Sequence, residues 1–245
     1  AYDVVASYLK DPHLRQAFSF QSLLIGGNPF KVSAIYTLIH ALEREWGVHF
    51  PRGGTHSLVL ALAKRFQELG GELRLNTPVT ELRERNGRIT EVATADGRSV
   101  PVRAVVSNAD VMHTYASLLK GTARGQAMAR TLARKRYSMS LFVVHFGLKR
   151  QHPGLAHHSV LFGPRYRELL EDIFERGVLA EDFSIYLHNP TASDQSLAPP
   201  GQSGFYALTP VPHLGKAAID WSVEGPKLAD RMLTALERTV LPGLR

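Results

Sequence analysis

LFVVHF, at Leu141 to Phe146, is an apolar run of strand length in the second half of the chain. Short apolar runs of this kind are typical of a strand that is covered on both faces. Further along, Phe183, Ile185 and Leu187 occupy alternate positions, which is the pattern of a strand covered on one face. The two patterns predict a sheet in this half of the chain.

Helical patterns surround this predicted sheet. Pro164 can open a helix in which apolar residues recur at helical spacing, and Gly177 can end it. A last helix is expected from Pro226 to Pro242. Near the N-terminus, Asp11-Pro12 supplies a helix cap and a first-turn proline. Apolar residues between Ile35 and Trp46 recur as on one face of a second helix.

The middle of the chain combines a helix with short strands. Thr55 can cap a helix, and Leu73 and Leu75 then alternate with charged residues as in a short strand. The turn signal Asn86-Gly87 predicts a β-meander, which closes with a strand from Val100 to Val106. We therefore expect a mixed α/β (α+β) fold.

Composition limits the classes of protein that the chain can represent. With 245 residues, of which 44% are hydrophobic, it can form one large or two ordinary domains. It has no cysteine, which excludes disulfides and thiolate metal sites. No run approaches the roughly 18 to 20 apolar residues that span a bilayer, and no signal-peptide pattern is present. The net charge of +7 would favour an anionic surface such as acidic lipid, or reflects only a solvated basic exterior.

The ends of the sequence suggest a piece of a longer protein. Ala1 is not an initiator Met, and the sequence stops as the last predicted helix ends. We expect a fragment.

A double glycine raises the question of a nucleotide-binding loop. FPRGGTHSL, at Phe50 to Leu58, places two glycines before a predicted helix. The stretch has neither the Walker spacing nor GxGxxG, so it does not predict a phosphate loop. The glycines let the backbone turn tightly and approach either a cofactor ring or another strand.

Other residue patterns do not assemble a catalytic site. His152, His157 and His158 lie close in sequence, but a metal site needs further ligands and second-shell carboxylates that the sequence does not identify, so we predict no metal. Ser107 lacks a GxSxG elbow, so a hydrolase is not expected. The basic residues between Arg124 and Arg136 lack interleaved aromatic residues, and we predict no nucleic-acid partner.

Longer segments carry more specific information than these short patterns. Six of them matter, in chain order: DPHLRQAFSFQSLLIGGNPF (Asp11 to Phe30), IYTLIHALEREWGVHFPRGGT (Ile35 to Thr55), VVSNADVMHTY (Val105 to Tyr115), AHHSVLFGPRYRELLEDIF (Ala156 to Phe174), DFSIYLHNPTASDQSLAP (Asp182 to Pro199) and TPVPHLG (Thr209 to Gly215). With these segments, nearly the whole chain resembles bacterial carotenoid desaturases of the phytoene desaturase type.

The resemblance implies an overall organisation. It implies part of a two-dinucleotide-binding-domain flavoprotein fold, plus a substrate domain with a mixed sheet flanked by helices. Residues 1–49 would be a helical part of the substrate domain, residues 50–110 a portion of the FAD-binding domain, and residues 111–245 the remaining substrate-binding domain. The double glycine would be the turn at which the chain re-enters the flavin domain.

The resemblance also implies cofactor contacts. In flavoproteins of this kind, the strand equivalent to Val79 contacts the adenine of FAD through its backbone. Ser107, Asn108 and Asp110 would lie where the chain leaves the flavin domain, as neighbours of the cofactor. The family's N-terminal fingerprint and C-terminal flavin-contacting segment are absent from this sequence. We therefore expect the main FAD-binding segments to be missing, and this chain alone to be inactive.

The implied activity is FAD-dependent dehydrogenation of phytoene toward lycopene or a related carotenoid. Such chemistry requires a water-poor slot beside the flavin more than it requires ionisable side chains. Phe18, Leu24, Trp46, Leu141 and Val143 are the residues that we expect to line a substrate tunnel, with an ordinary core role as the alternative for each.

Some properties follow from the substrate rather than from any motif. An oil-like substrate moves readily from lipid into an apolar tunnel, so we expect a cytoplasmic protein that associates peripherally with the membrane surface. The sequence identifies no catalytic residue: Glu43, Glu45 and Asp110 are candidate proton acceptors by residue type only. The oligomeric state is not predicted. The alternative function is a noncatalytic carotenoid- or lipid-binding module.

Overall fold

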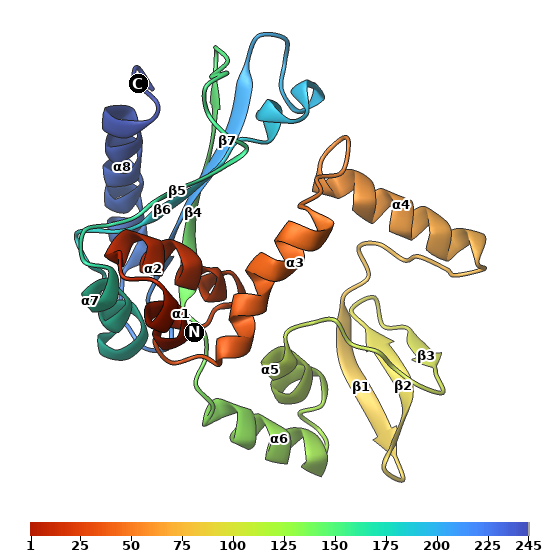
Figure 1. Ribbon diagram of the computed structural model, residues 1–245. Helices are drawn as coiled ribbons and strands as arrows, with labels where there is room; N and C mark the ends of the chain where they lie inside the picture. The colour runs from red at the N-terminus through yellow and green to blue at the C-terminus, as the bar shows by residue number, and fades with distance from the viewer. Residues whose placement is uncertain (245) are drawn as a thin grey trace. The chain divides into compact units, whose positions relative to one another are not determined.

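The structure, a computed structural model, describes residues 1–244 and divides the chain into two compact units (Figure 1). The first unit combines Ala1–Ala61 with the residues from Ser138 onward, and the second comprises Leu62–Tyr137. These boundaries differ from the changes expected at residues 50 and 110. The assignment of residues 50–110 to a cofactor domain stays a prediction.

A four-stranded sheet organises the first unit, with the strand order β4-β7-β6-β5. Its strands are β4 (Ser140–Leu148), β5 (His158–Leu161), β6 (Ile185–His188) and β7 (Ser203–Val211). All three neighbouring pairs are antiparallel. The α/β class is confirmed, but the expected mixed sheet is wrong. β6 and β7 are joined by a segment with two short 3₁₀ turns, η5 (Pro190–Ala192) and η6 (Gln195–Leu197), which brings the chain back antiparallel to β6.

The long helix α8 (Trp221–Thr239) packs along one face of this sheet (Figure 1). Buried residues of both elements form the main core: Ile185, Leu187, Phe205, Ala207, Val211, Leu228, Met232, Leu236 and Leu241. Phe142 and Val144 of β4 pack against it, whereas Leu141 remains 49% exposed on the opposite face. The prediction that Leu141 to Phe146 is covered on both faces is therefore wrong, because α8 covers only one of them.

The start of α8 also differs from expectation. The helix begins at Trp221, more than a turn before Pro226, because Asp220 Oδ1 accepts a hydrogen bond from Ser222 N at 3.0 Å. Pro226 lies inside the helix, where it leaves one carbonyl of the first turn without its helical donor.

Short helices make up the rest of the first unit. They are α1 (Tyr2–Tyr8), α2 (Pro12–Ser19), the 3₁₀ helices η1 (Phe20–Ile25) and η2 (Ala34–Thr37), α3 (Leu38–Trp46), and α7 (Tyr166–Glu171) with its π-helical continuation η4 (Asp172–Arg176). The predicted cap of α2 is confirmed, since Asp11 Oδ1 accepts hydrogen bonds from the amides of His13 and Leu14. Gly177 ends η4 in a left-handed conformation, as predicted. Among the described residues, no helix combines the length and apolar character needed to cross a membrane.

A second, smaller core lies where α7 meets η1. Leu169, Leu170 and Ile173 are nearly fully buried, and Leu23 of η1 packs against them. This contact holds α7 and η1 together as one helical layer.

The second unit contains a three-stranded antiparallel meander in the order β1-β2-β3. Its elements are β1 (Val79–Arg85), β2 (Arg88–Thr94), β3 (Ser99–Pro101), α5 (Val111–His113) with the π-helical turn η3 (Thr114–Leu118), and α6 (Ala123–Ala133). The helix α4 (Thr55–Glu68) runs from the first unit into the second. The Asn86-Gly87 turn is confirmed, with φ of 53° and 75°, as expected for a two-residue hairpin loop with two left-handed residues.

Two strand predictions in this unit are wrong. Leu73 and Leu75 are exposed in irregular backbone, and Asn76 takes a left-handed φ of 52° that turns the chain before β1. The strand expected from Val100 to Val106 is only Ser99–Pro101. Val102 N still donates to Thr90 O at 2.8 Å, but β2 begins at Arg88, so little partner strand remains beyond this bond.

Replacing Leu236 with Ala should lower the free energy of unfolding of the first unit by about 2 to 5 kcal/mol, because Leu236 is 0% exposed between α8 and the sheet. The ring of Trp221 stacks on Phe142 at 5.6 Å, so tryptophan fluorescence during denaturant unfolding should report the separation of α8 from the sheet. Val223→Ala, on the same helix but 48% exposed, is the matched control and should change stability by less than about 0.5 kcal/mol. Equal losses in the two variants would contradict this account of the core.

Candidate functional site

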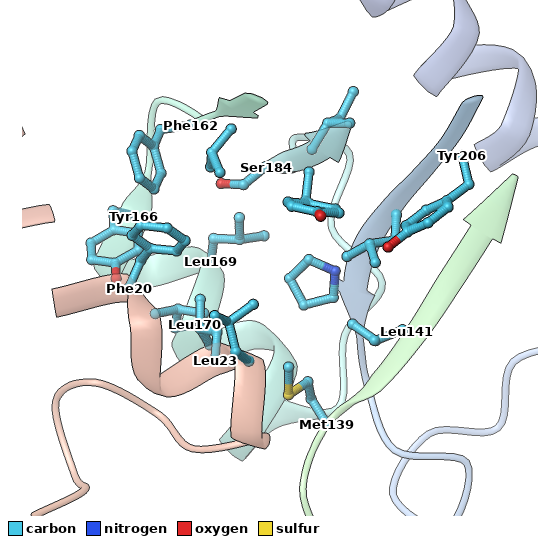
Figure 2. Close-up of a pocket in the computed structure, with 16 residues that line it drawn as sticks. Phe20, Leu23, Met139, Leu141, Phe162, Tyr166, Leu169, Leu170, Ser184 and Tyr206 are labelled. Carbon is cyan, nitrogen blue, oxygen red and sulfur yellow. The ribbon is translucent and has the colours of Figure 1, made fainter. Parts of the chain in front are cut away.

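An apolar cavity of about 280 Å³ lies between the helical layer and the sheet face that α8 leaves open (Figure 2). Its helical side includes Phe20, Leu23 and Leu24 of η1 and Tyr166, Leu169 and Leu170 of α7. Its strand side includes Leu141, Tyr206, Leu208 and Pro210. Figure 2 shows the labelled helical side chains, such as Phe20 and Leu170, on the opposite side of the cavity from Leu141 and Tyr206.

Strand alternation explains why these residues meet. Along β7, Phe205, Ala207 and Thr209 are buried, whereas Tyr206 and Leu208 between them are only partly covered. Because successive side chains of a strand point to opposite faces, the residues that do not face α8 must face the cavity. The sheet therefore supplies an apolar wall opposite η1 and α7.

The polar groups of the cavity are uncharged. The described lining residues include no Asp, Glu, Lys or Arg. Burial raises the pKa of Tyr166 to about 12. Burial and, secondarily, the hydroxyl of Tyr206 also raise the pKa of Tyr186. Ser184 Oγ accepts a hydrogen bond from Gly163 N at 2.9 Å. At neutral pH the cavity suits an apolar, uncharged ligand.

Imidazoles continue the same sheet face beyond the cavity. The hydroxyl of Tyr186, which lines the cavity, lies 2.6 Å from His158 Nδ1. His157 Nε2 and His188 Nε2 are 2.8 Å apart. Burial, and then the nearby His157 and His158, lower the pKa of His188 to about 4. This end of the face is polar but uncharged at neutral pH.

The structure regroups the histidines that the sequence had placed together. His152 packs against the Phe205 ring at 6.0 Å, and burial followed by the charge of Arg150 lowers its pKa. His188 takes its place beside His157 and His158. Sequence reasoning missed His188 because it lies on β6, whereas the other two lie at the start of β5.

The double glycine forms a tight turn against a loop. Gly53 and Gly54 have φ of 78° and 81°, which favour glycine. Gly53 N donates to Asp194 Oδ2 at 2.7 Å, and a Cβ on Gly54 would lie 3.2 Å from Leu197 Cδ2. Among the described residues the close neighbour is thus the η5–η6 loop rather than a strand, and the approach of a cofactor ring stays a prediction. α4 begins directly at Thr55, so the expected capping role of Thr55 is wrong.

The expected tunnel residues separate into two groups. Leu24 and Leu141 both line the cavity. Val143 lies exposed on the same face of β4, beyond the cavity lining. Phe18 and Trp46 are exposed outside the lining, with the Phe18 ring 5.0 Å from that of His40. A substrate role for all five stays a prediction.

Several lining residues were not selected from the sequence. Met139, Tyr186, Tyr206 and Leu208 contribute to the cavity. Alternation in SGFYALTPV, the sequence of β7, could have identified Tyr206 and Leu208 as members of one face. No local signal would have shown that this face is the one left open by α8.

The expected cofactor residues lie in the second unit. Val79 is the first residue of β1, an edge strand of the described sheet. Pro78 O accepts a hydrogen bond from Ala95 N at 2.9 Å, on the side of β2. Strand alternation therefore directs the backbone N–H and C=O of Val79 toward the unpaired edge.

The other three expected cofactor residues lie between β3 and α5. Ser107 Oγ lies 2.9 Å from Thr114 Oγ1, and Asn108 is exposed. Asp110 Oδ1 accepts a hydrogen bond from His113 N and begins α5. Their contacts with a cofactor stay predictions.

None of the three candidate proton acceptors lines the cavity. Glu43 accepts a hydrogen bond from Gln21 and lies 3.9 Å from His40, while Glu45 is exposed. Asp110 serves as a helix cap. The catalytic residue therefore stays unidentified.

Comparisons with known proteins agree with the sequence resemblance. A family model described as "Flavin containing amine oxidoreductase" matches residues 2–234. A "Phytoene desaturase (lycopene-forming)" from Pseudescherichia vulneris is 57% identical over 244 residues, covering 100% of this chain and 50% of that protein. A "Phytoene desaturase (neurosporene-forming)" from Rhodobacter capsulatus is 44% identical, covering 99% of this chain and 47% of that protein. The chain thus spans about half the length of the curated relatives it matches.

A solved structure supports the fold. The crystal structure of an oxidoreductase from Methanosarcina mazei matches with a TM-score of 0.70 and 18% identity, covering 98% of this chain and 52% of that one. At this identity the likeness concerns the fold alone.

The Gly53–Asp194 hydrogen bond predicts a pH-dependent anchor of the double-glycine turn. Hydrogen bonds from Ser196 and then Gly53 lower the pKa of Asp194. A carboxylate with a lowered folded-state pKa stabilises the fold above its unfolded pKa of about 3.9 and loses this contribution as pH falls through the folded value. Protection of the Gly53 amide against hydrogen exchange, corrected for the intrinsic rate, should therefore fall only under acid conditions.

Asp194→Asn should weaken this protection already at pH 7, as measured by NMR. Asp220→Asn is the matched control, because Asp220 is also bonded to a serine two residues later but caps α8 instead. Equal Gly53 protection in the wild type and in Asp194→Asn would count against the anchor.

Proposed function

The chain belongs to the family of flavin-containing amine oxidoreductases, and we propose that it is part of an FAD-dependent phytoene desaturase. The apolar, uncharged cavity between the sheet and the η1–α7 layer carries this proposal. Its chemistry fits a hydrocarbon substrate, and the relatives that match the whole chain at 57% identity are named lycopene-forming phytoene desaturases.

In this proposal the chain binds and orients the substrate and excludes water from it. Bound FAD supplies the acceptor for the hydrogens that leave the substrate. Walls of Leu, Phe, Met and Tyr side chains suit this task because they exclude water and carry no charge at neutral pH. The lack of Asp, Glu, Lys and Arg among the described lining residues agrees with this role.

The second unit would contribute to cofactor binding. The free backbone N–H and C=O that strand alternation assigns to the edge at Val79 match the paired acceptor and donor of an adenine edge. Ser107, Asn108 and Asp110 would lie near the cofactor along the segment that follows β3. These contacts would help to bind the cofactor and would take no part in the reaction itself.

The cavity would hold only part of the substrate. A C40 hydrocarbon is larger than a cavity of about 280 Å³, so the remaining length would follow the open sheet face past Leu141 and Val143. Burial is worth about 0.8 kcal/mol per CH₂ against water, but a lipid bilayer offers nearly the same environment. Transfer from a membrane therefore avoids the unfavourable passage through water.

We further propose that the protein meets its substrate at the cytoplasmic surface of a membrane. Large apolar side chains are exposed on η1, η2 and α3: Leu24, Ile25, Ile35, Leu38, Leu42 and Trp46. Such residues can enter the headgroup region of a bilayer, and the net charge of +7 would add attraction to anionic lipid.

A hybrid enzyme tests the desaturase proposal. This chain would replace the matching half of the Pantoea ananas phytoene desaturase, to which it is 57% identical. The hybrid should bind FAD, as measured by its absorbance spectrum, and convert phytoene supplied in liposomes. Leu141→Asp in the hybrid should lower conversion at least about 10-fold at unchanged flavin content, because the charge would lie in the cavity wall.

Val223→Asp is the control for this hybrid, since Val223 is exposed in the first turn of α8 on the other side of the sheet. It should leave conversion unchanged. A folded, flavin-loaded hybrid that binds carotenoid without converting it would favour the noncatalytic binding module instead. If the Leu141→Asp hybrid converts phytoene at the normal rate, the proposal that this cavity binds the substrate is wrong.

Liposome flotation tests the membrane proposal. The protein should float with vesicles that contain acidic lipid, less so with neutral vesicles or at high salt. Leu38→Asp and Trp46→Asp should reduce flotation, because both side chains are exposed on the proposed membrane face. Leu75→Asp, at an exposed position of the second unit, is the control. If flotation changes neither with the charge of the lipid nor with the two α3 substitutions, the proposed membrane-binding surface is wrong.

A further inference from the structure

Three imidazoles converge at the end of the open sheet face, beyond the apolar cavity. His158 of β5 and His188 of β6 are paired in the antiparallel register, and His157 immediately precedes β5. One ring nitrogen from each of the three lies within 4.8 Å of the other two. The cluster is independent of the substrate role proposed for the cavity.

Hydrogen bonds orient two of the rings. His157 Nδ1 lies 2.6 Å from Ser193 Oγ, and His158 Nδ1 lies 2.6 Å from the Tyr186 hydroxyl. When each Nδ1–H donates to its oxygen partner, Nε2 keeps its lone pair. Metal-binding histidines commonly have such a second hydrogen bond, which fixes both tautomer and ring orientation.

His188 completes the cluster with unused hydrogen-bonding capacity. Its Nε2 lies 2.8 Å from His157 Nε2, so the two nitrogens share one proton between them. Its Nδ1 is buried and has no hydrogen-bond partner among the described residues. A neutral imidazole that coordinates an ion through Nε2 carries its proton on Nδ1, so in the metal-bound state this buried Nδ1 would be a donor.

We propose that His157, His158 and His188 form a binding site for a divalent transition-metal ion, with water as the fourth ligand. Zn²⁺ is the ion that we favour. Three imidazoles without a thiolate suit Zn²⁺, Ni²⁺ or Cu²⁺ rather than Mg²⁺ or Ca²⁺. Tetrahedral zinc with Zn–N bonds of about 2.0–2.1 Å separates its ligand nitrogens by about 3.4 Å. On binding, the distance between His157 Nε2 and His188 Nε2 must therefore increase slightly from 2.8 Å. The longest distance between two ligand nitrogens, which is at most 4.8 Å, must decrease.

The surroundings permit both changes and the entry of an ion. His158 is exposed, so its ring can rotate and the site can be reached from solvent. Burial lowers the pKa of His158, and the carboxylate of Glu43 opposes this shift only in part. A bound ion would link β5 to β6, next to Tyr186, which lines the cavity and whose hydroxyl contacts His158.

Isothermal titration of the untagged, chelator-treated protein with ZnCl₂ tests the proposal. One equivalent of Zn²⁺ should bind to the wild type with micromolar or tighter affinity, and Co²⁺ should give the intense visible bands of a tetrahedral site. His188→Ala should weaken zinc binding at least about 100-fold by removing one ligand. Ser193→Ala should weaken it by roughly 10-fold, because it removes only the orienting hydrogen bond of His157.

His145→Asn is the matched control. His145 is exposed on β4, its ring 5.6 Å from Tyr206, and it lies outside the cluster. Its replacement should leave zinc affinity unchanged, and circular dichroism should show that every variant is folded. Should His188→Ala fail to fold, His157→Asn replaces it in the same titration. Absence of stoichiometric zinc binding in the wild type, or equal affinity in the ligand variants and the control, would overturn the proposal.

Discussion

The architecture of the first unit depends on the unequal covering of its sheet. α8 lies along one face and fully buries Met232 and Leu236 against strand residues. The opposite face is covered only where the η1–α7 layer reaches it. Because strand side chains alternate, each residue that fails to reach α8 must point to this partly covered face. The cavity is therefore a direct result of sheet geometry, and residues of β4, β7, η1 and α7 together make its lining apolar.

Local signals in the sequence predicted local structure well. Asp11 caps α2, Asn86-Gly87 forms the two-residue hairpin, and Gly177 ends η4 in a left-handed conformation. Each depends on hydrogen bonds or backbone angles within a few residues. The failures depend on distant partners. LFVVHF carries no information about which of its faces a helix covers, and the segment around Leu73 and Leu75 pairs with no strand among the described residues.

The same distinction applies to the candidate site. Leu24 and Leu141 were identified because apolar side chains on helices and strands can line an apolar substrate site, and both line the cavity. Tyr186, Tyr206 and His188 were missed, since their polar atoms resemble those of a solvated face. Only the pairing of β6 with β5 and β7 brings them together. The comparisons with relatives identify the family, whereas the strand pairing of the sheet explains why these particular residues lie on one surface.

Burial also explains how one sheet face accommodates oil-like and polar groups together. In a water-poor environment the charged form of any side chain is penalised, which raises the pKa of a phenol and lowers that of an imidazole. The pKa of Tyr166 is raised to about 12 and that of His188 is lowered to about 4. Both groups are neutral at physiological pH, so neither opposes an apolar ligand by carrying charge. Some of the phenols and imidazoles form hydrogen bonds with one another, as Tyr186 does with His158 and His157 does with His188. The face can thus remain uncharged along its length while it changes from apolar at Leu141 to polar at His188.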